Sequence, residues 1–156
     1  MKITSPVFEP GGLIPPKYTC EGLDENPPLV IRNIPNAAKS LSIIVEDQNV
    51  THGTFDHWIV WNIPVKEDIK ENMVPGLEGM NSLGGKGYKG PCPVSGTHHY
   101  FFRIFALDTI LELKEGASRK EVEEAMSKHI IASGKLVGLY KKMSEREEEE
   151  EEKKLN

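Results

Sequence analysis

The sequence predicts a mainly β fold in which neighbouring strands run antiparallel. Four segments are rich in β-branched and aromatic residues and are bounded by Pro, Gly, Asn or Asp, which is typical of strands. They cover residues 29–34, 40–46, 57–63 and 99–107. The link Asn-Ala-Ala-Lys between the first two is too short for a parallel crossover, which needs about a dozen residues. We therefore predict an antiparallel hairpin over the first two segments.

The last third of the chain predicts one helix and a further strand. A helix is expected to begin at Ser118, because Glu121 three residues later completes a capping box. Its apolar face would be formed by Val122, Met126 and Ile130. Gly134 is expected to end this helix. The following stretch, 135–143, favours a strand because Gly134 and Gly138 disfavour a longer helix.

Charge divides the chain into a nearly neutral body and an acidic end. The chain of 156 residues has a formal charge of -5, of which residues 145–156 contribute -4 through seven Glu and three basic residues. We predict one domain over residues 1–143 and an acidic tail over 144–156, either flexible or a helical extension. The body lacks the basic patch of a nucleic-acid-binding protein, so nucleic acid is not an expected partner.

The apolar residues do not predict a membrane protein. No stretch approaches the eighteen consecutive apolar residues of a spanning helix, and the first residues do not resemble a secretory signal. We therefore expect a cytoplasmic protein, where Cys20 and Cys92 would usually be reduced thiols. A disulfide between them is the alternative, and it would stabilise the fold by roughly 4 kcal/mol.

Two histidines stand at the beginnings of aromatic-rich strands, His57 and His98. Side chains alternate along a strand, so His98 shares a face with Tyr100 while His99 points to the other face. Imidazole and phenol donors, together with backbone N–H groups of the glycine-rich stretch 75–93, suit a phosphate-like anion. Asp47 would orient a histidine, accept a proton from a protonated phosphate or meet a ligand ammonium.

Two catalytic interpretations rank below anion binding. A zinc site from Asp47, His57 and His98 is chemically allowed, but no HExxH or paired CxxC spacing supports it. A Cys92 nucleophile with His98 as its base is also conceivable, because an imidazole can activate a thiol. We expect no cofactor and no bound metal, and a protein that is not an enzyme.

Several segments resemble the phosphatidylethanolamine-binding protein family, which includes the Raf kinase inhibitor-like proteins. EDQNV, GTFDHWIVWNIP and GYKGPCPVSGTHHYFFRIFALD resemble its two signature regions. KYTCEGLDENPPLVI and GASRKEVEEAMSKHIIASGKLVGLY resemble its bacterial and archaeal branch. The similarity extends from about residue 3 to Tyr140. It implies a β-sandwich-like fold with a large antiparallel sheet, a smaller second sheet and peripheral helices.

The resemblance also implies a small pocket for an anion. The residues that match its ligand-binding positions are Asp47, His57, Gly90, Pro91, His98 and Tyr100. The family binds phosphate, phosphorylethanolamine or similar head groups there, and some members inhibit kinases or serine proteases. We therefore expect a non-catalytic binding protein, with protease or kinase regulation as the alternative and a cysteine or metal hydrolase ranked last. Prokaryotic relatives suggest a homodimer.

This chain departs from the family pattern beside the pocket. Gln48, Asn49 and Thr51 stand where Pro, Asp and Pro are usual, and His99 stands where Arg is usual. The hypothesis is that Asn49 and His99 form a weaker, mutually compatible replacement for the usual acidic and basic pair.

Overall fold

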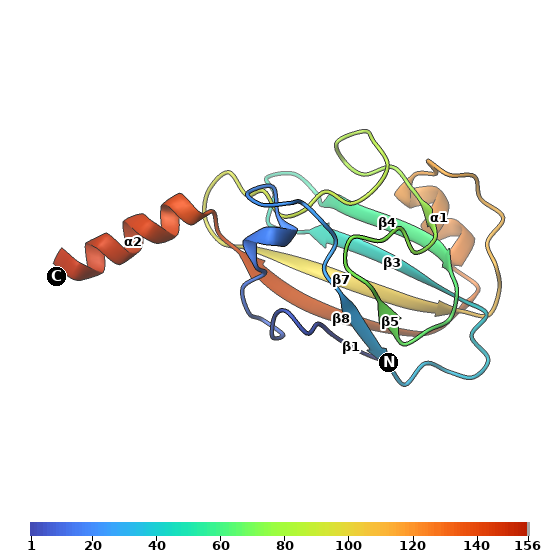
Figure 1. Cartoon of the computed structure of the whole chain (residues 1–156). Helices are drawn as coiled ribbons and strands as arrows, with labels where there is room; N and C mark the ends of the chain where they lie inside the picture. The colour runs from blue at the N-terminus through green and yellow to red at the C-terminus, as the bar shows by residue number, and fades with distance from the viewer. Residues whose placement is uncertain (156) are drawn as a thin grey trace.

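The computed structural model describes residues 1–155 and has two antiparallel β-sheets and two α-helices (Figure 1). The strands are β1 (Lys2–Thr4), β2 (Leu29–Arg32), β3 (Ser40–Asp47), β4 (Phe55–Ile63), β5 (Asp68–Ile69), β6 (Leu77–Glu78), β7 (His98–Leu107) and β8 (Ile130–Tyr140). The helices are a 3-10 turn η1 (Pro16–Tyr18), α1 (Arg119–Met126) and α2 (Met143–Leu155). The predicted fold class is confirmed, including the larger and the smaller sheet.

The larger sheet has the strand order β6-β4-β3-β7-β8, and the smaller has the order β1-β2-β5. Every residue of β3 is buried, because this strand lies inside the larger sheet and both of its faces are covered. One face contributes to the main core, with Leu41, Ile43 and Val45. On the other, Ile44 joins a second apolar cluster that includes Val122 of α1. The candidate site lies at one end of this larger sheet.

The predicted hairpin between residues 29–34 and 40–46 is wrong. β2 pairs with β1 and β5 in the smaller sheet, whereas β3 pairs with β4 and β7 in the larger sheet. Asn33 has a positive φ of 62° directly after β2, where the chain turns away from that sheet. A short link also suffices to cross between two packed sheets, since these lie about 10 Å apart. Link length alone therefore does not distinguish a hairpin from such a crossing.

The predicted helix begins where expected but ends early. Ser118 is the N-cap, and its capping box with Glu121 is complete. The helix ends at Met126, and Ile130 already pairs with Leu107 as the first residue of β8. The prediction that Gly134 ends a helix is therefore wrong, and His129, which the predicted helix would have contained, lies between α1 and β8. The strand predicted for 135–143 is confirmed as far as Tyr140 and begins earlier than expected.

Glycine at position 138 allows the N-terminal segment to pack closely on β8. A Cβ atom there would lie 2.6 Å from Cγ1 of Ile14 and 2.8 Å from Cε2 of Phe8. We expect Gly138→Val to lower the free energy of unfolding by about 1–3 kcal/mol through overpacking. Urea denaturation measures this loss. Gly85→Val is the control, since nothing lies within 4 Å of a Cβ built at Gly85; equal losses for both variants would contradict the packing argument.

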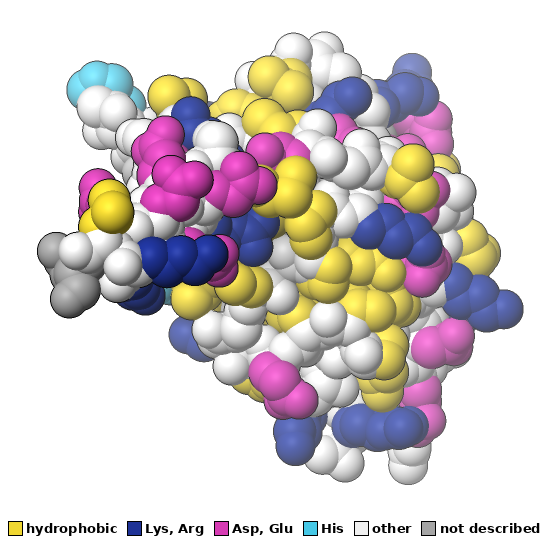
Figure 2. Space-filling view, turned by 60° about the vertical axis from the view of Figure 1, so that its left-hand side comes forward, with side chains coloured by type: hydrophobic (Ala, Val, Ile, Leu, Met, Phe, Trp, Pro, Cys, Tyr) yellow, Lys and Arg dark blue, Asp and Glu magenta, His cyan; other side chains and the backbone are white. Residues whose placement is uncertain are grey.

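The acidic tail forms the helix α2, which is the helical extension predicted as one of its two possible forms. No side chain of α2 is buried, and the helix extends away from the two sheets (Figure 1). Figure 2 turns this end of the molecule forward and shows acidic side chains gathered over it. Within residues 1–155, no helix combines the length and apolar character needed to cross a membrane.

Candidate functional site

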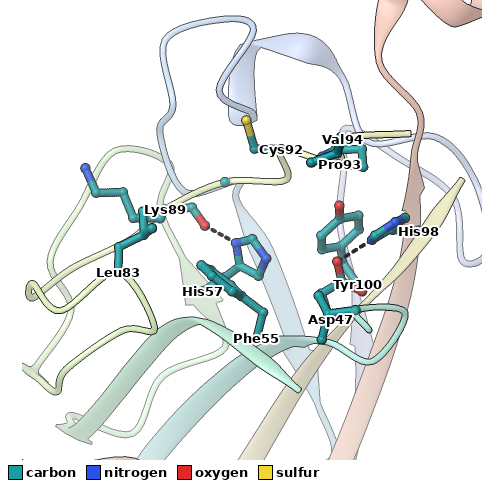
Figure 3. Close-up of a pocket in the computed structure, with 12 residues that line it drawn as sticks. Asp47, Phe55, His57, Leu83, Lys89, Cys92, Pro93, Val94, His98 and Tyr100 are labelled. Atoms are coloured by element: carbon teal, nitrogen blue, oxygen red, sulfur yellow. Dashed lines mark hydrogen bonds and ion pairs between the residues drawn. The ribbon is translucent and has the colours of Figure 1, made fainter. Parts of the chain in front are cut away.

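The predicted site residues meet at one end of the larger sheet. Asp47 is the last residue of β3, and the strand register places it opposite both Phe55 of β4 and Tyr100 of β7. A cavity of about 380 Å³ opens beside them, which is within the usual range for small-molecule sites. It is lined by Asp47, Val50, Phe55, His57, Leu83, Lys89, Gly90, Cys92, Pro93, Val94, His98 and Tyr100 (Figure 3).

Gly90 and Pro91 differ in how they relate to this cavity. Gly90 lines it, but its N–H donates to Oδ1 of Asp24 at 2.7 Å. A Cβ at this position would lie 2.3 Å from the carbonyl oxygen of Tyr18, so close packing requires glycine. Pro91 is buried and does not line the cavity; its carbonyl oxygen accepts from the N–H of Cys20 at 3.1 Å. Neither residue therefore offers a free backbone N–H to the cavity: that of Gly90 is bonded to Asp24, and proline has none.

His98 and Asp47 form a close pair at the cavity wall. Nδ1 of His98 lies 2.6 Å from Oδ2 of Asp47, and the two side chains are 17% and 5% exposed. The other carboxylate oxygen of Asp47 accepts from the N–H of Asn49 at 2.8 Å. Asp47 therefore orients the imidazole of His98, which was one of the roles expected for it. A carboxylate oriented in this way also holds the proton of His98 on Nδ1.

His57 faces the same cavity from β4. Its Nδ1 donates to the carbonyl oxygen of Lys89 over 2.5 Å, and its ring packs 4.8 Å from the ring of Phe55 and 5.3 Å from that of Tyr100. Burial lowers the pKa of His57, and it outweighs the Lys89 carbonyl and the nearby Asp47 carboxylate, which raise the pKa. The imidazole is therefore held in its neutral form more strongly than a free histidine.

Tyr100 presents a buried hydroxyl at the cavity. The residue is 0% exposed, and within residues 1–155 its hydroxyl oxygen makes no hydrogen bond of ordinary geometry. Burial raises the pKa of Tyr100 far above its usual range; the Asp47 carboxylate adds to this effect and the Cys92 backbone opposes it. The phenol therefore stays protonated and can donate a hydrogen bond.

Cys20 and Cys92 are joined by a disulfide bond. We expected reduced thiols at these two positions, and the structure has instead the disulfide that was the alternative. A Cys92 nucleophile would need a free thiol, so the disulfide also removes the basis of the cysteine-hydrolase alternative. For the zinc alternative, no group of three or more His, Cys, Asp or Glu side chains in residues 1–155 is arranged to hold a metal ion.

Sequence reasoning missed the apolar part of the cavity lining. These residues are Val50, Phe55, Leu83, Pro93 and Val94. Phe55 was detectable, because it stands two positions before His57 and therefore shares its face of the strand. Val94 and Leu83 come from irregular segments, where no periodicity predicts the direction of a side chain. They are 84% and 66% exposed, which places them at the cavity mouth.

Two of the four residues that depart from the family pattern, Asn49 and His99, are in contact. Oδ1 of Asn49 accepts from the backbone N–H of His99 at 2.8 Å and lies 3.0 Å from Nδ1 of its ring. This contact agrees with the hypothesis that Asn49 and His99 replace a charged pair. His99 is exposed and does not line the cavity, as strand parity predicted.

Comparison with known proteins identifies a family. The model of the phosphatidylethanolamine-binding protein family matches residues 4–141. A UPF0098 protein of Pyrococcus horikoshii is 49% identical over 153 residues, which cover 91% of this chain and 77% of the relative. A UPF0098 protein of Methanothermobacter thermautotrophicus is 41% identical, with 91% and 99% covered.

Two solved structures share the fold. The crystal structure of a putative phosphatidylethanolamine-binding protein homologue from Chlamydia trachomatis superposes with a TM-score of 0.87 at 40% identity, covering 90% of this chain and 97% of that one. E. coli YbcL superposes with a TM-score of 0.83 at 24% identity, covering 90% and 98%, and supports the fold alone. With a family match over most of its length, the chain belongs to the phosphatidylethanolamine-binding protein family.

Proposed function

We propose that this protein binds a phosphate-bearing small molecule in the cavity beside His57, His98 and Tyr100, without catalysing a reaction. The observation that carries the proposal is the Tyr100 hydroxyl, which is buried and makes no hydrogen bond of ordinary geometry in residues 1–155; the Cys92 backbone lies nearby but outside that geometry. Buried polar groups in proteins are nearly always hydrogen-bonded, so an unpaired hydroxyl beside a cavity suggests that a ligand supplies the partner. A phosphate oxygen is a suitable acceptor for this phenol.

The size and lining of the cavity favour an organic phosphate over the bare ion. Its volume of about 380 Å³ exceeds what a single phosphate group needs. Polar groups gather at the ends of β3, β4 and β7, while Val50, Phe55 and Val94 provide an apolar wall. Sites that bind small molecules commonly combine an apolar lining with a few polar groups that set the orientation. The ligand is therefore a phosphate ester whose organic part contacts the apolar wall.

We expect Tyr100→Phe to weaken the binding of phosphorylethanolamine about tenfold or more, because a hydrogen bond to a charged group contributes about 1.5–3 kcal/mol. Isothermal titration calorimetry with the purified protein measures the dissociation constant. The variant keeps the aromatic ring and so leaves the core packing in place.

The matched control removes a phenol that does not line the cavity. Tyr140 is also fully buried, but its hydroxyl donates to Oε1 of Glu21 at 2.6 Å. Tyr140→Phe should therefore leave the dissociation constant unchanged. Absence of binding by the unmodified protein, or equal weakening in both variants, would reject this site assignment.

The remaining expectations stay predictions. Regulation of a serine protease or kinase, the homodimer and the cytoplasmic location are expectations from family resemblance and sequence.

A further inference from the structure

His57 is an extra residue in the pairing of β4 with β3. The strand register places Val45 opposite Trp58 and the next residue, Glu46, opposite Asp56. His57 lies between these two pairs and has no partner on β3. An extra residue of this kind in one of two antiparallel strands is a β-bulge, which changes the direction of the side chains around it.

The bulge determines which face of the sheet His57 occupies. Trp58 packs in the main core, and Ile59 packs in the second apolar cluster on the other face. Strict alternation would therefore place His57 on the same face as Ile59. His57 instead lines the cavity, with its ring 5.3 Å from the ring of Tyr100 (Figure 3). Its carbonyl oxygen accepts from the N–H of Lys89 at 2.9 Å. His57 thus reaches the cavity because the bulge interrupts the alternation.

One cation joins the two strands immediately beside the bulge. Nη1 of Arg119, the first residue of α1, lies 2.6 Å from Oε2 of Glu46 and 2.7 Å from Oδ1 of Asp56. All three side chains are at least three-quarters buried, so water and salt screen these contacts only weakly. Like charges directly opposite each other on paired strands are destabilising. The guanidinium of Arg119 offsets the repulsion between Glu46 and Asp56 and holds them together.

These contacts lie on the opposite face of the sheet from the cavity. Asp47 follows Glu46 along β3, and His57 follows Asp56 along β4. Adjacent side chains on a strand point to opposite faces, and only Asp47 and His57 of these four line the cavity. Each carboxylate that Arg119 holds is therefore the immediate chain neighbour of a cavity residue.

We propose that Arg119 is a positioning residue for the candidate site. By joining Glu46 to Asp56 it fixes the bulge that turns His57 toward the cavity, although Arg119 itself does not line the cavity. The effect on ligand binding rests on the proposed phosphate site, whereas the bulge is a property of the protein without a ligand. Without the guanidinium, the two carboxylates repel each other and the ends of β3 and β4 are no longer held together.

Arg119→Gln measures the effect on binding. Glutamine is also a good helix former, but it lacks the charge that joins the two strands. We expect isothermal titration calorimetry with phosphorylethanolamine to show a dissociation constant raised about fivefold or more. Val122→Ala is the matched control, because it removes a buried contact of the same helix without touching the two carboxylates. It should leave the dissociation constant unchanged. Equal weakening in both variants would contradict the inference.

Nuclear magnetic resonance reads the bulge without a ligand. In the unmodified protein we expect a nuclear Overhauser effect between the rings of His57 and Tyr100 and slow exchange of the Lys89 N–H. In Arg119→Gln the ring contact should weaken, and the Lys89 N–H should exchange about tenfold faster or more. The N–H of Leu139, which donates to the Gly12 carbonyl at 2.8 Å, should keep its rate.

This measurement separates the two proposals. If phosphorylethanolamine does not bind the unmodified protein, the proposed function is rejected, and the exchange rates still decide the role of Arg119. An unchanged ring contact and an unchanged Lys89 rate in Arg119→Gln would overturn the inference. Equal acceleration at Lys89 and Leu139 would also overturn it, since that result indicates general destabilisation.

Asp56→Ala releases β4 while α1 keeps its other contacts. Arg119 still pairs with Glu46 and with Glu123 in this variant, so the result is decisive even if Arg119→Gln does not fold. We expect faster exchange at Lys89 and weaker binding, in the same direction as for Arg119→Gln. Glu123→Gln is the reciprocal control, because it removes a helix contact and leaves both strand contacts in place; it should change neither quantity. Normal exchange and binding in Asp56→Ala would reject the positioning role.

Discussion

Cys20→Ser combined with Cys92→Ser is expected to lower the free energy of unfolding by roughly 4 kcal/mol. The disulfide joins positions that are 72 residues apart, so it restricts the unfolded chain over nearly half of its length. Both cysteines are exposed, and serine at either position therefore buries no unpaired hydroxyl. Guanidinium denaturation of the two proteins in the absence of reductant measures the difference.

Reduction of the unmodified protein provides an independent comparison. In the presence of a strong thiol reductant, its denaturation curve should move to that of the double variant. The curve of the double variant is the control and should not move when the reductant is added. A loss below about 1 kcal/mol in the double variant would contradict the expected stabilisation by a cross-link of this length.

Glu46→Gln is expected to lower the free energy of unfolding by about 3 kcal/mol near neutral pH, the lower end for breaking a buried ion pair. The side chain is 3% exposed, and its two oxygens lie 2.5 Å from Nε of Arg103 and 2.6 Å from Nη1 of Arg119. Burial raises the pKa of Glu46, but hydrogen bonds from the two arginines outweigh it and leave the pKa below its usual range. Denaturation with urea measures the loss.

The contribution of Glu46 should depend on pH in one direction. A carboxyl group whose pKa is lower in the folded state stabilises that state fully above its unfolded pKa, and the effect is lost as the pH falls through the folded value. The difference between the unmodified protein and Glu46→Gln should therefore be constant near neutral pH and shrink as the pH falls below about 4.5 towards about pH 3.

Glu123→Gln is the matched control for this ion pair. Glu123 contacts the same Arg119, but its side chain is 50% exposed. Exposed pairs spaced four residues apart on a helix contribute about 0.5 kcal/mol or less. Equal losses in Glu123→Gln and Glu46→Gln, or a Glu46 effect that stays constant down to about pH 3, would contradict the importance of burial.

Strand parity was the most reliable guide to the site. Along β7 the side chains of Tyr100, Phe102 and Ile104 are buried, whereas His99 is exposed. The sequence therefore predicted which residue of the His98–His99 pair belongs with Tyr100. Parity works here because β7 lies between β3 and β8 and its pairing with both is regular from His98 or Tyr100 to Ala106, with a register shift only between Ala106 and Leu107.

Hydrophobic periodicity failed to predict where α1 ends, because the apolar residue that follows the helix also fits its spacing. Ile130 has helical spacing from Val122 and Met126, yet it begins β8. Its pairing with Leu107, 23 positions earlier in the chain, is a contact that no local pattern contains. The helix boundary was therefore predictable at Ser118, where capping is local, and not at its other end.

By itself, the sequence determined the features that neighbouring residues encode: four strands, the start of α1, the face shared by His98 and Tyr100, and the family resemblance. The tertiary structure decided how distant segments meet. It placed β2 and β3 in different sheets, joined Cys20 to Cys92 and brought Asp47 within 2.6 Å of His98. It also directed Nδ1 of His57 to the Lys89 carbonyl. These outcomes depend on packing between residues far apart in the chain, which periodicity and capping, being local, do not describe.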